Sequence, residues 1–342
     1  MEVYLMPYQQ IVNATYQILD QNRAEWEPRY AEYTKSFTPF KISIKLPDTL
    51  KKYTSISLET KAKQICDLRY QGQHIANLTQ ITGKKYIQID PDTATSNAKC
   101  LKNCINILST PTIGNGILWQ SQDGKNIRKF FEADYGKIGH EEHTLESAFL
   151  TELSQKTSTG KSILGIQPIV FEGKRLQLAT TLKASKVYNF FSPRNTKSLQ
   201  QLIGYSGPKG GGIDILARRK KGNKTYLTII ELKDKYVANE KPTKSIGQAI
   251  AYATFIAMLI RSDNANGVGW YRKFGFKQNR PTKLTLYAVV AMPDIPKNIE
   301  NETQNQFNMY HKLIVPNTNA EIVLHYMNLN NNAKVISTSN NF

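Results

Sequence analysis

The sequence predicts an α/β fold in which helices flank a central mixed sheet, and three neighbouring segments carry that prediction. Within residues 210–233, two strand-like runs flank the turn signal Gly222-Asn223, which favours an antiparallel hairpin. An apolar helix is expected next, over residues 243–261, and an apolar strand after it, over 283–293. A hairpin, a helix and a further strand in this order indicate helices packed on a mixed sheet.

The residues before this core predict a separate N-terminal α+β region over 1–130. Gly and Asn cluster in 112–116 and 122–126, which favours a boundary between residues 125 and 140. We expect this region to serve recognition, dimerisation or the sensing of an activating signal. Its predicted helices are 8–22, 57–81 and 97–109. Its predicted strands are 40–47 and 84–90.

Residues 131–342 predict one domain with more regular patterning. A helix is expected over 143–156, with Thr144 as its N-cap and an apolar stripe along one face. The Asn-rich tail, 328–342, is expected to fray. The remaining predicted elements are the strands 165–171, 175–182 and 320–329 and a helix over 305–315.

The overall composition favours a polyanionic partner. The 342 residues carry a formal net charge of +18, above the roughly 2–8 that solubility asks of a small domain. Because phosphate contacts release counterions, such an excess indicates nucleic-acid binding. The cysteines Cys66, Cys100 and Cys104 lack the paired spacing of a zinc site. Uninterrupted apolar runs are too short for a membrane helix and no signal-peptide pattern is found, so we expect a cytoplasmic protein.

The predicted hairpin carries charges where strands ordinarily carry apolar residues. If it closes at Gly222-Asn223, Asp214 faces Glu231, and Lys233 shares their side of the sheet. Two facing carboxylates repel, so they need a shared proton or a cation, and Mg²⁺ prefers carboxylate oxygens. The alternative is a surface hairpin whose charges form cross-strand ion pairs. The apolar residues expected to seat the hairpin on the core from its other face are Ile213, Ile215, Ile230 and Leu232.

Two motifs in the hairpin resemble those of the PD-(D/E)xK nucleases, which include restriction endonucleases, resolvases and RecB-like nucleases. They are Gly211-Gly-Ile-Asp214 and Glu231-Leu-Lys233. The proline that the family often has before the aspartate is replaced here by Ile213. Glu146 resembles the acidic residue of the family's first core helix, and Gln248-Ala-Ile-Ala-Tyr252 resembles the Gln-x-x-x-Tyr of the RecB-like branch.

This resemblance spans roughly residues 140–295 and implies a restriction-endonuclease-like core with a metal-dependent active site. It implies that Asp214, Glu231, Glu146 and the carbonyl of Leu232 hold Mg²⁺, with Mn²⁺ as a substitute. Glu141, Glu142 and Glu152 are nearby alternatives to Glu146. Lys233 would position or deprotonate the attacking water, and Gln248 would orient Lys233 or contact the substrate backbone.

The function that the resemblance implies is a Mg²⁺-dependent DNA endonuclease acting in restriction or anti-phage defence. Double-stranded DNA is the expected substrate and a homodimer the expected assembly. A non-cleaving nucleic-acid-binding protein and a DNA-repair or recombination nuclease are the alternatives.

Basic and aromatic residues suggest where DNA would be held. The side chains expected to bind its phosphates are Arg218, Arg219, Lys220, Lys221 and Lys224 around the hairpin turn, with Tyr252 as a further contact. A solvated charged turn is the alternative. Trp270, Tyr271, Phe274 and Phe276 would either stack on bases or form a buried aromatic cluster.

Overall fold

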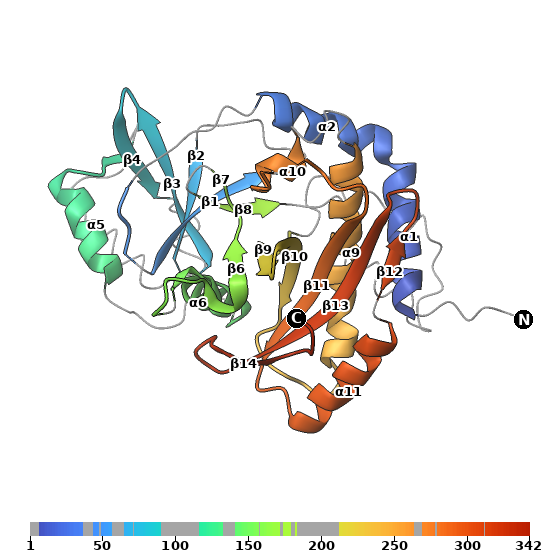
Figure 1. The fold of residues 1–342 in the computed structure, drawn as a ribbon. Coiled ribbons are helices and arrows are strands. Elements are labelled where there is room, and N and C mark those ends of the chain that lie inside the picture. Colours follow the sequence, from blue (N-terminus) through green and yellow to red (C-terminus); the bar gives the residue numbers. More distant parts are fainter. Residues whose placement is uncertain are drawn as a thin grey trace, which may run out of the picture.

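The structure, a computed structural model, describes residues 7–36, 44–47, 49–56, 65–70, 72–89, 116–132, 141–156, 158–171, 174–178, 182, 212–262, 269–277, 279–310 and 312–342. Within these residues the chain forms two seven-stranded sheets with helices packed around them (Figure 1). The predicted α/β class is therefore confirmed.

The sheet that contains the predicted hairpin is mixed. Its strands lie in the order β12-β13-β11-β10-β9-β6, with β14 beside β13. β10 pairs parallel with β11, and β11 pairs parallel with β13, whereas the other pairs are antiparallel. The strands are β6 (Ile166–Pro168), β9 (Ile215–Lys221), β10 (Lys224–Leu232), β11 (Leu284–Pro293), β12 (Leu313–Val315), β13 (Ala320–Leu329) and β14 (Val335–Thr338).

Helices cover both faces of this mixed sheet. The buried helix α9 (Pro242–Ser262) packs on one face against β10, β11 and β13, and α6 (Glu141–Ser154) packs on the other, against β6 and β10. The N-terminal helices α1 (Pro7–Gln21) and α2 (Arg23–Ser36) pack in turn against α9. Two further helices are α10 (Trp270–Lys273) and α11 (Lys297–Met309).

The second sheet follows the order β5-β4-β3-β2-β1-β8-β7, and only its β1–β8 pair is parallel among the described residues. Helix α5 (Gln122–Glu132) buries Ile127, Phe130 and Phe131 in the core of this sheet. The strands are β1 (Leu50–Ile56), β2 (Ile65–Tyr70), β3 (Gln73–Ile81), β4 (Lys84–Ile89), β5 (Ile117–Leu118), β7 (Val170–Phe171) and β8 (Lys174–Leu178).

Packing among the described residues crosses the boundary predicted at residue 130. Helices α1 and α2 place Tyr8, Leu19 and Trp26 in the same hydrophobic cluster as α9, far along the chain. Conversely, β7 and β8 lie beyond residue 130 but belong to the second sheet. Long-range burial of apolar surface, which a local composition shift does not report, decides this division.

The helix predicted over 57–81 was the largest error among the described elements. Residues 65–70 and 73–81 form β2 and β3 instead, and residues 57–64 lie outside the described part. Cys66, Leu68 and Tyr70 are all buried, so the apolar residues alternate with a strand's period of two. Gly72 joins the strands with a φ of 79°, a conformation that favours glycine.

Several smaller expectations were also corrected. The tail forms β14 and buries Phe342 instead of fraying. Thr144 lies inside α6, which begins at Glu141, and its hydroxyl has no hydrogen-bond partner among the described residues. The helix expected over 305–315 begins earlier, as α11, and gives way to β12. Residues 44–47 carry no strand, and the helix expected over 97–109 lies outside the described residues.

Helix α9 is long and apolar enough to cross a membrane by length and composition alone. However, 83% of its most apolar window is buried inside the protein, as is usual for a core helix. Its first residue, Pro242, suits a helix start because the first turn leaves backbone N–H groups unbonded in any case.

The ordered tail creates a buried histidine on β13. His325 is 3% exposed, and its Nδ1 lies 2.8 Å from the hydroxyl of Ser339. Burial, assisted by the positive charges of Arg219 and Lys221, lowers the pKa of His325 from 6.5 to about 3. The folded protein therefore keeps this imidazole neutral at pH values at which an unfolded chain would protonate it.

We expect His325 to make the fold sensitive to acid. Between pH 6.5 and 3 the unfolded state binds the extra proton, so the free energy of unfolding falls as the pH drops, by up to about 1.4 kcal/mol per pH unit. His325→Asn can keep the contact with Ser339 but does not titrate. Urea unfolding at pH 7 and pH 5 should show a smaller loss of stability for this variant. Equal losses would contradict the prediction.

Candidate active site

The hairpin β9–β10 has the register that the turn signal predicted. Lys221 pairs with Lys224, and Ile215 pairs with Ile230. Asp214 lies one residue before β9, where its Oδ2 accepts a hydrogen bond of 2.8 Å from the backbone N–H of Leu232. This bond fixes the Asp214 side chain against the end of β10.

One of the four seating residues departs from the expected face. Ile215, Ile230 and Leu232 lie in the hydrophobic cluster of α6, as predicted for a shared face. Ile213 instead lies in the cluster of α9. The strand pairing has ended at Ile215, so strict alternation no longer governs Ile213.

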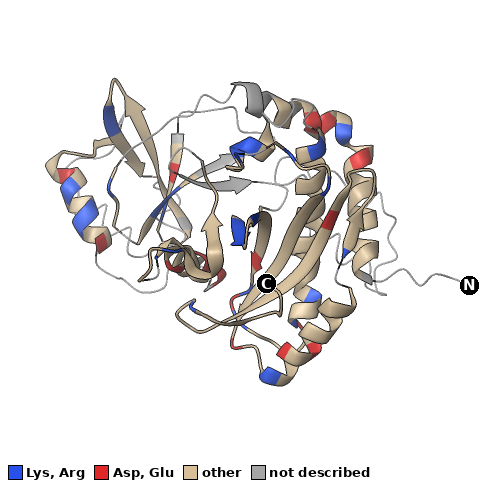
Figure 2. Ribbon diagram, in the orientation of Figure 1, with Lys and Arg blue, Asp and Glu red and all other residues tan. Residues whose placement is uncertain are grey.

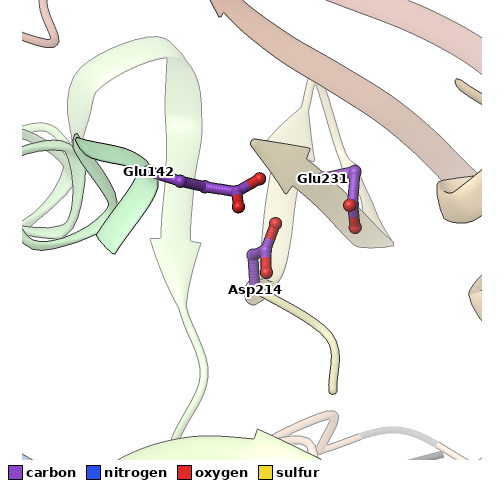
Figure 3. Close-up of side chains that lie close together, drawn as sticks. All are labelled: Glu142, Asp214 and Glu231. Atoms are coloured by element: carbon purple, nitrogen blue, oxygen red, sulfur yellow. The ribbon is translucent and has the colours of Figure 1, made fainter. Parts of the chain in front are cut away.

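Three carboxylates converge at this end of the hairpin (Figure 3). Glu142 from α6, Asp214 before β9 and Glu231 near the end of β10 each offer an oxygen, and these oxygens all lie within 4.8 Å of one another. Glu231 is only 4% exposed, whereas Asp214 is half-buried and Glu142 more open. The cluster is thus buried at Glu231 and accessible to solvent at Glu142.

Lys233 is the cation of this cluster. Its Nζ lies 2.9 Å from Glu231 Oε1 and 3.4 Å from Glu142 Oε1. Its backbone N–H donates a 3.0 Å bond to the carbonyl of Ala291 on β11, which anchors the residue beyond the strand end. Burial lowers the pKa of Lys233, but the negative charges of Glu231 and Glu142 outweigh burial, so the net pKa is raised.

Burial is the main cause that raises the pKa of two carboxyl groups of the cluster. Burial, followed by the charges of Glu231 and Glu146, raises the pKa of Asp214 well above its ordinary range, although the Leu232 N–H opposes the shift. Burial raises the pKa of Glu231 to about 7 against the opposing effect of Lys233. One ammonium therefore does not balance the negative charge of the cluster.

Glu146, the helix residue that the resemblance implied as a ligand, borders the cluster. It lies one turn beyond Glu142 on α6 and is 5% exposed. The hydroxyl of Tyr53, on β1 of the second sheet, donates a 2.7 Å hydrogen bond to Glu146 Oε1. Arg69 lies over the ring of Tyr53, 4.5 Å from its centroid. The two sheets thus meet directly behind the carboxylates.

We expect Tyr53→Phe to destabilise the protein by about 1–3 kcal/mol, because it removes a hydrogen bond from a buried carboxylate. Urea unfolding of this variant, of Glu146→Gln and of the double variant forms a thermodynamic cycle. A coupling energy of about 1 kcal/mol or more is expected. Additive effects would show that the contact contributes nothing.

Helix α9 brings a tyrosine to the cluster. Tyr252 is 4% exposed, and burial, followed by the charges of Glu231, Asp214 and Glu142, raises its pKa. Gln248 is half-buried one turn earlier, on the same face of the helix. Tyr252 is therefore buried beside the carboxylates, and its contact with DNA stays a prediction.

The basic residues at the hairpin tip are split between structural and exposed positions. Arg218 donates to the carbonyl of Gly275, Arg219 to that of Leu164 and Lys221 to that of Asn341. Lys220, Lys221 and Lys224 are exposed. At ~3.3 Å per residue, the tip lies roughly 20 Å along the strands from Asp214, so it does not flank the carboxylates as expected.

The aromatic segment after α9 follows the buried alternative. Trp270, Tyr271, Phe274 and Phe276 are each at most 9% exposed. Tyr271 and Phe276 stack on each other with ring centroids 4.4 Å apart. These four rings therefore belong to the core and do not offer a platform for bases.

The carboxylate cluster fits a hard divalent ion. Its donors are all carboxylate oxygens, which Mg²⁺ prefers. Glu231 Oε2 is buried and has no hydrogen-bond partner among the described residues, although a buried carboxylate oxygen ordinarily has one. A cation between the three side chains would satisfy that oxygen and would offset the burial and the nearby negative charges that raise the pKa of Asp214 and Glu231.

Sequence reasoning found most of this cluster but not all of its helical part. It named Asp214, Glu231 and Lys233, and it offered Glu142 only as an alternative to Glu146. The role of Tyr53 carried no sequence signal, because a strand tyrosine far from the motifs is unremarkable until the chain has folded. No protein family, curated protein or solved structure matches this chain. Any proposal about its function therefore depends on the geometry of this site and on the spacing of the motifs.

Proposed function

We propose that the protein is a Mg²⁺-dependent DNA endonuclease with a restriction-endonuclease-like core, acting in restriction or another form of anti-phage defence. The observation that carries the proposal is the convergence of Asp214, Glu231 and Glu142 around the ammonium of Lys233. A pure ion-pair hairpin has no need for a third carboxylate from a separate helix. It also has no need for a buried carboxylate oxygen without a hydrogen-bond donor.

The order of elements supports the core that the resemblance implies. An acidic helix, α6, precedes the hairpin, and a helix with Gln248 and Tyr252, α9, follows the Glu-x-Lys strand. The next strand, β11, lies parallel to β10. A helix-flanked mixed sheet of this kind gives the active side chains rigid supports, as a pre-organised site requires.

Each site residue has a distinct part in phosphodiester hydrolysis. Glu142, Asp214 and Glu231, with the carbonyl of Leu232, would hold the ion, while Glu146 buttresses them from behind. Bound there, a divalent ion supplies Lewis-acid neutralisation of the phosphate and an activated water.

The neighbouring side chains would act on the substrate directly. The ammonium of Lys233 donates hydrogen bonds to a phosphate oxygen or to the attacking water, which orients the reaction. Gln248, one turn from Tyr252 on α9, has an amide that can orient Lys233 or contact the substrate backbone. Mn²⁺ has similar ligand preferences and is expected to replace Mg²⁺.

A plasmid assay tests the proposal. Supercoiled DNA incubated with the protein should be nicked or linearised in Mg²⁺ or Mn²⁺ and remain intact in EDTA. Asp214→Asn and Lys233→Met should abolish the reaction, whereas Asp294→Asn, which removes a charge from an exposed turn, should not. Cleavage that survives in EDTA or in both site variants would reject the assignment.

A non-cleaving nucleic-acid-binding protein is the second candidate, favoured by the net charge of +18. It predicts retention of DNA in a gel without strand breaks in any metal. Cleavage products also separate the defence role from a repair or recombination nuclease. Ends that share one sequence indicate restriction of double-stranded DNA, for which a homodimer would cut both strands.

A further inference from the structure

A groove of about 1160 Å³ lies at the opposite end of the β9–β10 hairpin from the carboxylates. The starts of β10 and β11 contribute to it, together with residues of the segments 160–167 and 271–283. The cluster at Asp214 lies before β9, whereas this groove surrounds the turn after β9. The two features are therefore separate sites on one rigid hairpin.

The groove is strongly basic. Figure 2 shows Lys and Arg at the hairpin tip and on nearby α10, and acidic residues towards the other end of β10. Among the described residues one carboxylate lines the groove, that of Glu321, and it is already paired with Lys283 at 2.8 Å. Lys220, Lys224 and Lys277 are exposed. The cationic residues that line the groove are Lys161, Arg218, Lys220, Lys224, Lys277 and Lys283.

An aromatic surface accompanies these charges. Tyr226 lines the groove, is half-buried, and stacks on Tyr287 with ring centroids 4.6 Å apart and planes 12° apart. A partly open ring beside a row of lysines is the combination that binds a nucleic-acid strand, because bases stack on the ring while phosphates meet the ammonium groups.

Without a bound ion, the carboxylate cluster does not itself attract a polyanion. Three converging carboxylates repel a polyanion, so cations elsewhere must supply the affinity. Along β10 the groove at Lys224 lies about 23 Å from Glu231, at ~3.3 Å per residue. That length corresponds to roughly seven base pairs of duplex at ~3.4 Å per step.

We propose that this groove is an exosite that binds the phosphodiester backbone of nucleic acid away from the cut position. The exosite rests on the proposed function only in its purpose, because only an endonuclease would use it to hold a substrate. The groove takes its ligand by charge and stacking, so it binds with little dependence on sequence and with strong dependence on salt.

The test measures binding without catalysis. Fluorescence anisotropy of a labelled oligonucleotide, single-stranded in one arm and duplex in the other, is followed in EDTA against the full chain. The groove variant carries Lys220→Gln, Lys224→Gln and Lys277→Gln. The control carries the same three charge losses on β4 and α5, at the exposed Lys84, Lys125 and Lys129. Thermal unfolding verifies that both variants remain folded.

The groove variant should bind at least ~10-fold more weakly than the control in one or both arms. Its plot of log affinity against log salt should be shallower by about 2–3, since each lost phosphate contact removes ~0.7–0.9. The arm with the larger loss identifies a single strand or a duplex as the ligand. Equal affinities of the groove variant and the control in both arms would overturn the proposal.

These results separate the exosite from the endonuclease. If the protein never cuts DNA but the groove variant loses binding, the exosite is supported and the proposed reaction is rejected. If the protein cuts DNA in Mg²⁺ but binds equally well with and without the three lysines, the proposed reaction is supported and the exosite is rejected.

Discussion

Asp214→Asn is expected to abolish Mg²⁺-dependent DNA cleavage while making the metal-free protein more stable. Cleavage should fall by on the order of 10³-fold or more, because the amide removes one of the three charges that would hold the ion. A residue whose replacement removes activity but raises stability is present for catalysis and not for folding.

The gain in stability follows from the sign of the pKa shift. Burial and the neighbouring charges of Glu231 and Glu146 raise the pKa of Asp214 in the folded protein. A carboxyl group with a raised folded pKa stabilises the fold only at low pH, and this contribution is lost as the pH rises through that pKa. At pH 8 the variant escapes this penalty, so its free energy of unfolding should exceed that of the metal-free wild-type protein. Its side-chain oxygen can still accept the bond from Leu232.

Urea unfolding at pH 8, in EDTA and again with Mg²⁺, measures both effects. Mg²⁺ at ten times its dissociation constant should stabilise the wild-type protein by about 1.4 kcal/mol and the variant by almost nothing. Asp294→Asn is the matched control, since Asp294 is exposed and its φ of 54° suits asparagine equally well. Equal stabilisation of all three proteins by Mg²⁺ would mean that the ion binds elsewhere.

The hairpin was predictable because its information is local. The turn Gly222-Asn223 sets the register, and the strand period of two then places Asp214 beside Glu231 without knowledge of any other element. Helix α9 was predictable for the same reason, since its long apolar run lies within one segment of the chain. In both cases neighbouring residues in the chain decide the structure.

The rest depended on contacts between distant segments. Glu142 and Glu146 are one helical turn apart, and only the docking of α6 decides which one reaches Asp214. Tyr53 meets Glu146 across 93 residues of chain. The error over 57–81 arose because Leu, Ala and Gln favour helices, whereas tertiary burial selected the alternating pattern of β2 and β3.

Lys233→Met is expected to act on stability in the opposite direction from Asp214→Asn. Without the ammonium, the buried Glu231 loses its 2.9 Å partner, and the metal-free protein should lose about 3–5 kcal/mol of unfolding free energy. Cleavage should fall by roughly 10²–10⁴-fold, because the donor that faces the phosphate or the water is gone. Lys233→Arg retains a cation and should keep most of the stability.

Mg²⁺ should stabilise Lys233→Met more than it stabilises the wild-type protein, because the ion replaces the missing positive charge and no longer competes with an ammonium. Unfolding titrations with Mg²⁺ at pH 8 measure this difference. A surface hairpin held by ion pairs predicts otherwise: both Asp214→Asn and Lys233→Met would weaken the fold, and Mg²⁺ would change neither. We expect the two variants to change the free energy of unfolding in opposite directions and both to lose cleavage. This combination can arise only if the carboxylates are arranged to hold a cation in addition to the ammonium of Lys233.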